Sequence, residues 1–329
     1  MSHNEQWAFE QLGPDAILDA IEATGRLCDG RTLALNSYEN RVYRVGIEDA
    51  PPLVAKFYRP QRWSDEAIRE EHRFSRELAD ADIPVIAPLA DENGETLFRH
   101  GLFRFALFPV RGGRAPELDN PGQLEVIGRF VARLHLIGEQ CEFVHRPQLN
   151  VKRLGEDSVN FLLDSPHLPR ELQASYRAIS TDLLAAVRER FAHASAVRQL
   201  RIHGDLHPGN LLWRDGTPHI VDLDDCCNGP AIQDLWLFLS GDRQYRSARL
   251  ADLLCGYEEF REFDPRELHL VEALRALRQL YYAAWLARRW EDPAFQQAFP
   301  WFASARFWDD HILALREQRA AMDEPDLIW

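Results

Sequence analysis

The pattern of apolar and polar residues divides the chain into a first part rich in strands and a second part rich in helices. Between residues 32 and 110, short runs of β-branched and aromatic residues are separated by Gly, Pro and acidic turns, which predicts strands. These runs are 41–47 (RVYRVGI), 52–58 (PLVAKFY), 95–101 (ETLFRHG) and 102–110 (LFRFALFPV). One helix is predicted before them at 14–24, and a second, capped by Ser64, interrupts them at 64–81.

Helical patterns dominate after residues 111–122, where Gly and Pro cluster without an apolar period. Helices are predicted at 123–140, 171–197 and 266–290, and the apolar stripe of the first consists of Leu124, Ile127, Val131, Leu134 and Leu136. The exception is 210–223, where "NLLW" and "HIVDL" flank the turn "RDGTP" as two short strands would. We therefore expect an α+β fold with a small β-rich lobe, residues 1–110, and a larger, mostly helical lobe, residues 111–329, that carries one hairpin.

Composition and charge narrow the class of protein. The 329 residues are 46% hydrophobic and 27% charged, as in an ordinary globular protein, and the net charge of -14 argues against a nucleic-acid surface. No uncharged apolar run is long enough to span a membrane, and the first residues carry no apolar signal core. The five cysteines form no CxxC pair and suit a reducing compartment. We expect a cytoplasmic protein, a monomer in preference to an oligomer, with no nucleic-acid or membrane partner.

The stretch "RIHGDLHPGN", residues 201–210, concentrates polar side chains among glycines and a proline. His203 and His207 are four residues apart, but Gly204 and the Pro208-Gly209 pair disfavour the helix that would bring them together on a metal. A polar turn would explain the Gly and Pro residues but not the aspartate that follows at the end of a predicted strand, in "IVDLDD".

Phosphoryl transfer from ATP explains the whole pattern. The reaction needs a carboxylate that accepts the proton of the acceptor hydroxyl, together with an amide oxygen and a second carboxylate that hold Mg²⁺. Asp205 and Asn210 share one loop, and the hairpin returns Asp222 beside them, in the form H-x-D-x4-N of kinases. The sequence therefore predicts Asp205 and Asp222 as catalytic residues, with Asn210 and Asp222 as the metal ligands.

With "HGDLHPGN" and "VDLDD", the chain resembles the aminoglycoside phosphotransferase-like kinases, bacterial relatives of eukaryotic protein kinases. Within that group, "LNSYENRVYRV", "VAKFYRP", "VDLDDCCNGPAIQDLW" and "YYAAWLARRW" are similar to the stress response kinase A family, over about residues 30–310. The resemblance implies a two-lobed, protein-kinase-like fold that uses ATP and Mg²⁺. It also implies a serine/threonine protein kinase that acts on a protein substrate, autophosphorylates and serves stress survival.

A lysine in an apolar strand is the candidate residue that neutralises the phosphates from the other side of the cleft. Lys56 lies in "PLVAKFY", and a buried ammonium needs an acidic partner, although a solvated lysine on an edge strand is the competing interpretation. The resemblance implies that Lys56 holds the α- and β-phosphates and pairs with Glu71, while Glu70 stays possible.

The resemblance extends to three further nucleotide contacts. It places the phosphate-covering loop at "NSYENRV", without the usual glycine pattern, and assigns Ser37 to a phosphate. It assigns the adenine contacts to the main chain of Phe108 and Val110, because Pro109 has no N–H. Three aspartates are expected to support the site without reacting: Asp224 and Asp225 beside the metal ligand, and Asp234 as an anchor of the catalytic loop.

The acceptor is the least determined part. A small-molecule phosphotransferase for aminoglycoside-, choline- or homoserine-like alcohols is the alternative, and a pseudokinase scaffold is disfavoured by the complete set of polar residues. Aromatic residues near the C-terminus could line an acceptor wall, although core packing is the preferred interpretation: Tyr281, Tyr282, Trp285, Trp290, Trp301 and Trp308. Residues 223–233 leave no room for an activation loop, so we expect no switch by phosphorylation there.

Overall fold

The computed structural model describes residues 8–329, and the internal contacts divide the chain into two compact units. Unit 1 joins the residues up to Glu117 with two later segments, Phe143–Arg146 and His207–Cys226. Unit 2 consists of Leu118–Glu142, Pro147–Leu206 and Cys227–Trp329. The expected α+β class is confirmed. The division differs from the expected single boundary after residue 110, because the chain returns twice to unit 1.

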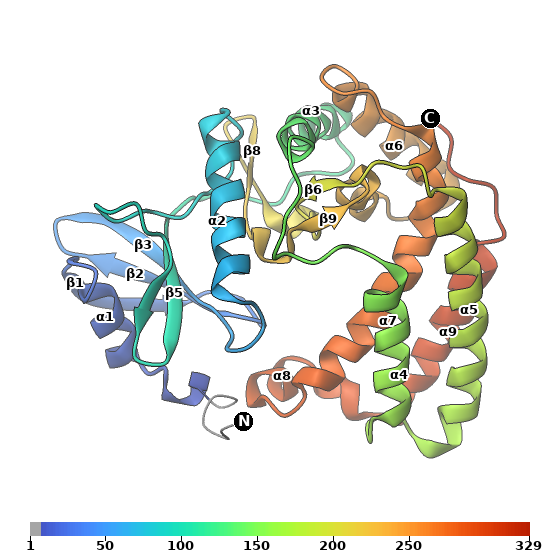
Figure 1. Ribbon diagram of the computed structural model, residues 1–329, viewed down its shortest axis with the longest axis horizontal. Helices are drawn as coiled ribbons and strands as arrows, with labels where there is room; N and C mark the ends of the chain where they lie inside the picture. Colours follow the sequence, from blue (N-terminus) through green and yellow to red (C-terminus); the bar gives the residue numbers. More distant parts are fainter. Residues whose placement is uncertain (1–7) are drawn as a thin grey trace. The chain divides into compact units, whose positions relative to one another are not determined.

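Unit 1 is built on a five-stranded antiparallel sheet in the order β1-β2-β3-β5-β4 (Figure 1). The strands are β1 Cys28–Ala34, β2 Arg41–Ile47, β3 Ala50–Phe57, β4 Phe98–His100 and β5 Phe103–Pro109. The 3₁₀ turn η1 Ala8–Gln11 and helix α1 Pro14–Glu22 precede the sheet, and α2 Asp65–Asp80 follows β3. As expected, the Ser64 hydroxyl caps α2 by accepting from the Ala67 N–H at 3.2 Å.

The alternation of side chains along β3 separates a structural face from a polar one. Ala55 and Phe57 are buried in the core that the sheet forms with α1. Lys56 lies between them in sequence, so its side chain projects from the opposite face, where it bonds to Glu71 of α2. The period of two residues therefore turns a single charge in an apolar strand toward α2.

The predicted hairpin forms within unit 1. Strands β7 Leu211–Arg214 and β8 Thr217–Ile220 pair in the register Leu211↔Ile220. The two residues of the turn, Asp215 and Gly216, both have positive φ, which the tight connection requires. Short 3₁₀ turns stand at its open end, η4 Pro208–Asn210 before β7 and η5 Leu223–Asp225 after β8.

Unit 2 is mostly helical, with one two-stranded sheet of β6 Leu200–Ile202 and β9 Cys227–Gly229. Its helices are α3 Pro121–Gly138, α4 Asp157–Asp164, α5 Gln173–His193, α6 Arg243–Tyr257, α7 Val271–Arg289, α8 Pro293–Ala298 and α9 Ala305–Ala321. A π-helical turn, η2 Lys152–Glu156, and the 3₁₀ turns η3 Arg170–Leu172, η6 Ala231–Asp234, η7 Trp236–Phe238, η8 Pro265–Leu270 and η9 Pro300–Ala303 complete it. The close packing of α3 on α6 requires glycine, because a Cβ at Gly128 would stand 2.0 Å from the Leu253 carbonyl oxygen.

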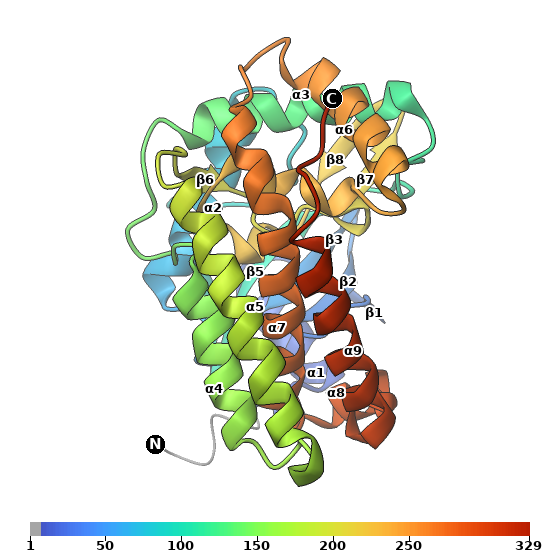
Figure 2. The same ribbon diagram turned by 90° about the vertical axis from the view of Figure 1, so that its right-hand side faces the viewer.

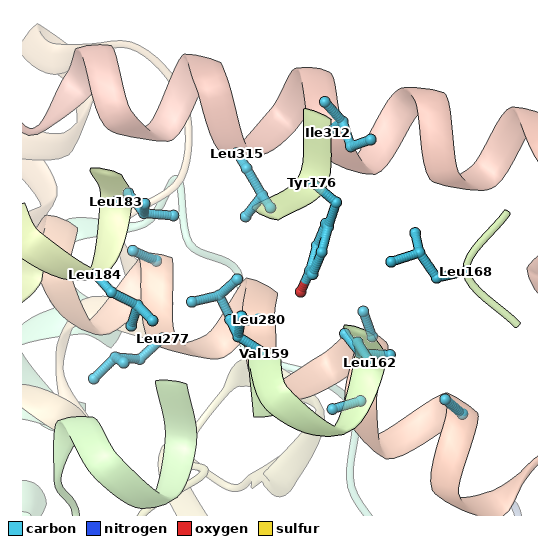
Figure 3. Close-up of a cluster of buried hydrophobic side chains, with 14 of the residues drawn as sticks. Val159, Leu162, Leu168, Tyr176, Leu183, Leu184, Leu277, Leu280, Ile312 and Leu315 are labelled. Carbon is cyan, nitrogen blue, oxygen red and sulfur yellow. The ribbon is translucent and has the colours of Figure 1, made fainter. Parts of the chain in front are cut away.

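Helices α4, α5, α7 and α9 run side by side and enclose a large core cluster (Figure 2). Figure 3 shows its side chains converging from these helices, with Leu280 of α7 and Tyr176 of α5 fully buried. From this bundle, α7 carries the side chain of Arg278 to Asp205 in the loop after β6.

The aromatic C-terminal segment is buried only in part, and its role as an acceptor wall stays a prediction. Trp308 is buried in the bundle core, as the packing interpretation requires. Tyr282 and Trp301 instead keep 40% and 43% of their surface exposed, so packing does not account for them fully.

Among residues 8–329, no helix combines the length and apolarity needed to cross a membrane.

Candidate active site

The open end of the hairpin brings the two expected metal ligands together. The Asn210 carbonyl oxygen accepts from the Val221 N–H at 3.0 Å, one step beyond the pair Leu211↔Ile220. Asp222 follows directly, with its side chain 53% exposed and its backbone in the left-handed region at φ 62°. An amide and an exposed carboxylate thus stand at one end of the hairpin, a donor set that suits a hard cation such as Mg²⁺.

Lys56 is buried and paired with acids, so the interpretation as a solvated edge lysine is wrong. Its side chain is 8% exposed, and its Nζ lies 3.3 Å from Glu71 Oε1, 3.1 Å from Asp222 Oδ1 and 3.2 Å from Asp224 Oδ1. Burial disfavours the ammonium, but the attraction of the carboxylates, led by Asp224, overcomes it and raises the pKa of Lys56 well above its ordinary value. Lys56 is therefore a permanent cation beside Asp222.

The choice between the two glutamates of α2 is settled by their partners. Glu71 pairs with Lys56, whereas the carboxylate of Glu70 accepts from the main-chain N–H groups of Val144, His145 and Arg146, each at 2.8 Å. Adjacent acids on one helix thus have separate purposes: Glu71 faces the lysine, and Glu70 binds the segment Phe143–Arg146 to α2.

Asp224 contacts more residues of the site than the supporting role expected from sequence implies. It is buried and contacts Lys56 and Arg62 through its carboxylate, which also accepts from Asn40 Nδ2 at 3.1 Å. Although burial opposes its charge, Arg62, Lys56 and Arg146 hold the pKa of Asp224 well below its usual range. It therefore stays ionised and orients the lysine next to the hairpin.

Asp205 lies in unit 2, on a loop that a buried aspartate holds in place. Asp234 Oδ2 accepts from the His203 N–H at 2.7 Å and Oδ1 from the Gly204 N–H at 2.8 Å, while His135 Nε2 lies 3.2 Å from Oδ2. This contact agrees with the anchoring role expected for Asp234. Gly204 has φ 85°, which glycine adopts without strain, so the loop turns sharply just before Asp205.

The carboxylate of Asp205 has a basic neighbour on the bundle. Arg278 of α7 donates through Nη1 to Asp205 Oδ1 at 2.5 Å. The chain passes from unit 2 to unit 1 between Leu206 and His207. That Asp205 converges with Asn210 and Asp222 on one phosphoryl group stays a prediction.

The remaining expected nucleotide contacts occupy unit 1. Ser37 is half-buried in the loop between β1 and β2, and Phe108 and Val110 are half-buried at the end of β5. The Phe108 ring packs beside the cluster that Tyr58 and Ile68 form between the sheet and α2. Their contacts to a nucleotide stay predictions.

Four residues of the site were not anticipated: Asn40, Arg62, Arg146 and Arg278. Asn40 lies in the expected phosphate-covering loop, whereas the three arginines belong to no motif, and all four residues reach their partners across a long stretch of chain. A weak signal existed for Arg62, which comes six residues after Lys56 and just before the predicted cap of α2.

Comparison with known proteins identifies a family. The pattern of the phosphotransferase enzyme family matches residues 31–271. Stress response kinase A of Escherichia coli (strain K12) is 44% identical over 325 residues, which cover 99% of this chain and 98% of that protein. The protein named serine/threonine protein kinase RdoA, of Salmonella typhimurium, matches with the same identity and coverage.

Solved structures agree on the fold. An amicoumacin kinase, hAmiN, in complex with AMP-PNP, Ca²⁺ and Ami, has a TM-score of 0.73 at 20% identity, over 99% of this chain and 98% of that one. A microcompartment-associated aminopropanol kinase has a TM-score of 0.69 at 18% identity, covering 94% of this chain and 97% of that one. The resemblance and the kinase-like fold expected from sequence are therefore confirmed.

Proposed function

The chain belongs to the phosphotransferase enzyme family, and from this premise we propose that it is an ATP- and Mg²⁺-dependent serine/threonine protein kinase of the stress-response type. The observation that carries phosphoryl transfer is the buried Lys56, which bonds at once to Glu71 and to the exposed Asp222. A cation beside an exposed carboxylate is the arrangement that a metal-bound triphosphate needs.

The metal would be held by the residues at the open end of the hairpin. Asp222 offers a carboxylate and Asn210 an amide oxygen, and two such ligands leave the other positions of Mg²⁺ for water and phosphate oxygens. When bound, Mg²⁺ neutralises charge on the phosphates during transfer. Lys56 would hold the α- and β-phosphates, and Ser37 would add a contact from the loop after β1.

The transfer itself needs one proton acceptor. Asp205 would take the proton of the acceptor hydroxyl while that oxygen bonds to the γ-phosphorus and the bond to the β,γ-bridging oxygen breaks, releasing ADP. Arg278 would orient the Asp205 carboxylate through the bond at 2.5 Å. The main chain of Phe108 and Val110 would contact adenine.

The protein acceptor rests on sequence likeness alone. Two relatives that are 44% identical over 325 residues are named a stress response kinase and a serine/threonine protein kinase. That likeness favours a protein hydroxyl over a small alcohol, and with it autophosphorylation, a cytoplasmic location and a monomeric state.

One assay separates the candidate acceptors. Labelled ATP and Mg²⁺ are incubated with the enzyme alone, with a generic protein substrate and with a panel of small alcohols. Label in protein supports the proposal, whereas label only in a small alcohol would establish a metabolite kinase. No transfer to any acceptor, with ATP still bound, would indicate a pseudokinase.

Asp205→Asn tests the proton acceptor. The amide cannot accept the proton at neutral pH, so we expect kcat to fall by roughly 10²–10⁴-fold. The affinity for ATP should stay within a few-fold of the unmodified protein, because the proposed role of Asp205 is to accept the proton of the acceptor hydroxyl and not to bind the nucleotide. A variant with unchanged kcat would remove Asp205 from the reaction.

A further inference from the structure

A buried arginine binds the far side of the glutamate that pairs with Lys56. Arg146 has a side chain with no exposed surface, and its Nη2 donates to Glu71 Oε2 at 2.6 Å. Lys56 bonds to the other oxygen of the same carboxylate, Oε1. Each oxygen of Glu71 thus has its own cation.

The same guanidinium holds three further groups of unit 1. Nη1 donates to the main-chain oxygen of Asp224 at 2.6 Å, and Nε donates to the main-chain oxygen of Ala67 in α2 at 2.8 Å. Its plane lies over the Trp63 ring, 4.5 Å from the centroid. Arg146 therefore ties α2 to the segment that follows Asp222, independently of Lys56.

The segment that carries Arg146 is itself bound to α2. Glu70 accepts three main-chain N–H groups from Val144, His145 and Arg146. The Phe143 ring stands edge-on to Phe74 of α2, with centroids 5.4 Å apart. These contacts fix the position of the main chain at Arg146. Its guanidinium is therefore oriented in the free protein, before any ligand binds.

We propose that Arg146 is a positioning residue that holds Glu71, and through it Lys56, in the nucleotide-binding arrangement without any phosphorylation. This inference rests on the proposed function. Residues 223–233 are taken up by η5, β9 and the start of η6, which leaves no long loop between Asp222 and Asp234 to receive a phosphate. A permanent cation from the segment Phe143–Arg146 makes such a device unnecessary, because it orders α2 through bonds already present in the free protein.

The variant that tests this role is Arg146→Lys. Lysine keeps the charge but cannot bond to Glu71, Asp224 and Ala67 together, because it lacks the planar fork of donors. Losing one charge-assisted hydrogen bond that orients Glu71 should raise the KM for ATP roughly tenfold. The matched control is Arg104→Lys, since Arg104 also bonds to α2, through Asp65 at 2.9 Å, without contacting Glu71.

The expected result is a tenfold rise in the KM for ATP in Arg146→Lys, with Arg104→Lys within twofold of the unmodified enzyme. Equal KM values in the two variants would show that Arg146 has a structural role and does not position Glu71 for nucleotide binding. If Arg146→Lys does not fold, Glu70→Gln replaces it, because it loosens the segment without altering the guanidinium. It should raise the KM in the same direction, and an unchanged KM there would overturn the proposal.

A second measurement addresses the independence from phosphorylation. Enzyme treated with a phosphatase, and shown by mass spectrometry to carry no phosphate, should retain its full rate. Loss of the rate on treatment would overturn the proposal. An unmodified enzyme that transfers no phosphoryl group would instead defeat the proposed function, and the role of Arg146 would then be decided by the dissociation constant for ATP, with the same tenfold expectation.

Discussion

Glu267 is an acid that the fold keeps in an unusual protonation state, and it offers the sharpest test of the interior of unit 2. It lies in η8, is 1% exposed, and accepts from the Ile232 N–H at 2.7 Å. Ile232 belongs to η6, the same turn as Asp234, which anchors the loop before Asp205. We predict that the stability of Glu267→Gln, measured relative to the unmodified protein, increases as the pH rises from acidic to neutral.

The sign follows from the direction of the pKa shift. Burial raises the pKa of Glu267 from 4.5 to about 7, against the hydrogen bond from Ile232, which lowers it. The folded protein therefore binds this proton more tightly than the unfolded chain does. The stability it contributes is complete below pH 4.5 and is lost as the pH rises toward 7.

The magnitude follows from the same two values. At about 1.4 kcal/mol for each pH unit between 4.5 and 7, the loss amounts to about 3 kcal/mol. Glutamine has the same shape, keeps an oxygen for the Ile232 N–H and does not titrate. The stability of Glu267→Gln relative to the unmodified protein should therefore rise by about 3 kcal/mol between pH 4.5 and 7.5.

The assay is chemical denaturation followed by circular dichroism, for both proteins, at several pH values between 4.5 and 8. Other ionisable groups also change protonation on unfolding in this range, so only the difference between the two proteins is interpreted. Glu262→Gln is the control, because it makes the same chemical change at an exposed position five residues earlier in the chain. A difference between Glu267→Gln and the unmodified protein that stays constant from pH 4.5 to 7.5 would refute the argument from burial.

Three further substitutions test the packing and the charges. Asp234→Ala leaves two buried N–H groups without their acceptor and should lower the free energy of unfolding by about 3 kcal/mol in denaturation; a loss below 1 kcal/mol would contradict this. Leu280→Ala empties the centre of the bundle and should cost about 2–5 kcal/mol, visible as a lower Tm, whereas an unchanged Tm would exclude tight packing there. Lys56→Met removes the buried cation that pairs with Glu71 and Asp224 and that would hold the phosphates. Calorimetry should therefore show ATP binding weakened at least tenfold, and unaltered binding would place the phosphates elsewhere.

Periodicity predicted the elements that local residues determine. The helix expected at 64–81 exists as α2 with the Ser64 cap, and the hairpin forms around its two-residue turn. The apolar stripe of α3 is buried except for Leu136, which is half-buried. On a helix of 3.6 residues per turn, Leu136 lies about 160° from the middle of the other four residues, so it is on the opposite side of α3 from them.

The sequence pattern did not predict the elements that form only through contacts with distant residues. Strands β6 and β9 have three residues each and form because they pair with one another, 25 residues apart at the register Ile202↔Cys227. Three residues show no period, so only the pairing defines them. The same holds for Arg146, whose partners Glu71 and Asp224 lie 75 and 78 residues away.

The motif correctly predicted that two of its polar residues lie at one end of the hairpin, whereas their roles as metal ligands stay predictions. Asn210 and Asp222 were placed together by the hairpin alone, and the register confirms that they flank its open end. The resemblance favoured Glu71 over Glu70 as the partner of Lys56, and the bond between Lys56 Nζ and Glu71 Oε1 agrees with it. Glu70 stayed possible because neighbouring positions on a helix differ by only about 100°, and its bonds to the segment Phe143–Arg146 could not be read from the sequence.

The energetics of unit 1 also indicate which part of it is shaped for function. Burying Lys56, Glu71 and Asp224 requires removing three charges from water, and apolar residues of similar size would commonly stabilise a fold as well or better. Beside this cluster, Asp222 adopts a left-handed backbone that costs a non-glycine residue about 1 kcal/mol or more, and yet its carboxylate remains half-exposed. A fold selected for stability alone has no reason to combine buried charges with a strained, solvent-facing acid. Their combination is accounted for if the lysine and Asp222 together await an anionic ligand and its metal.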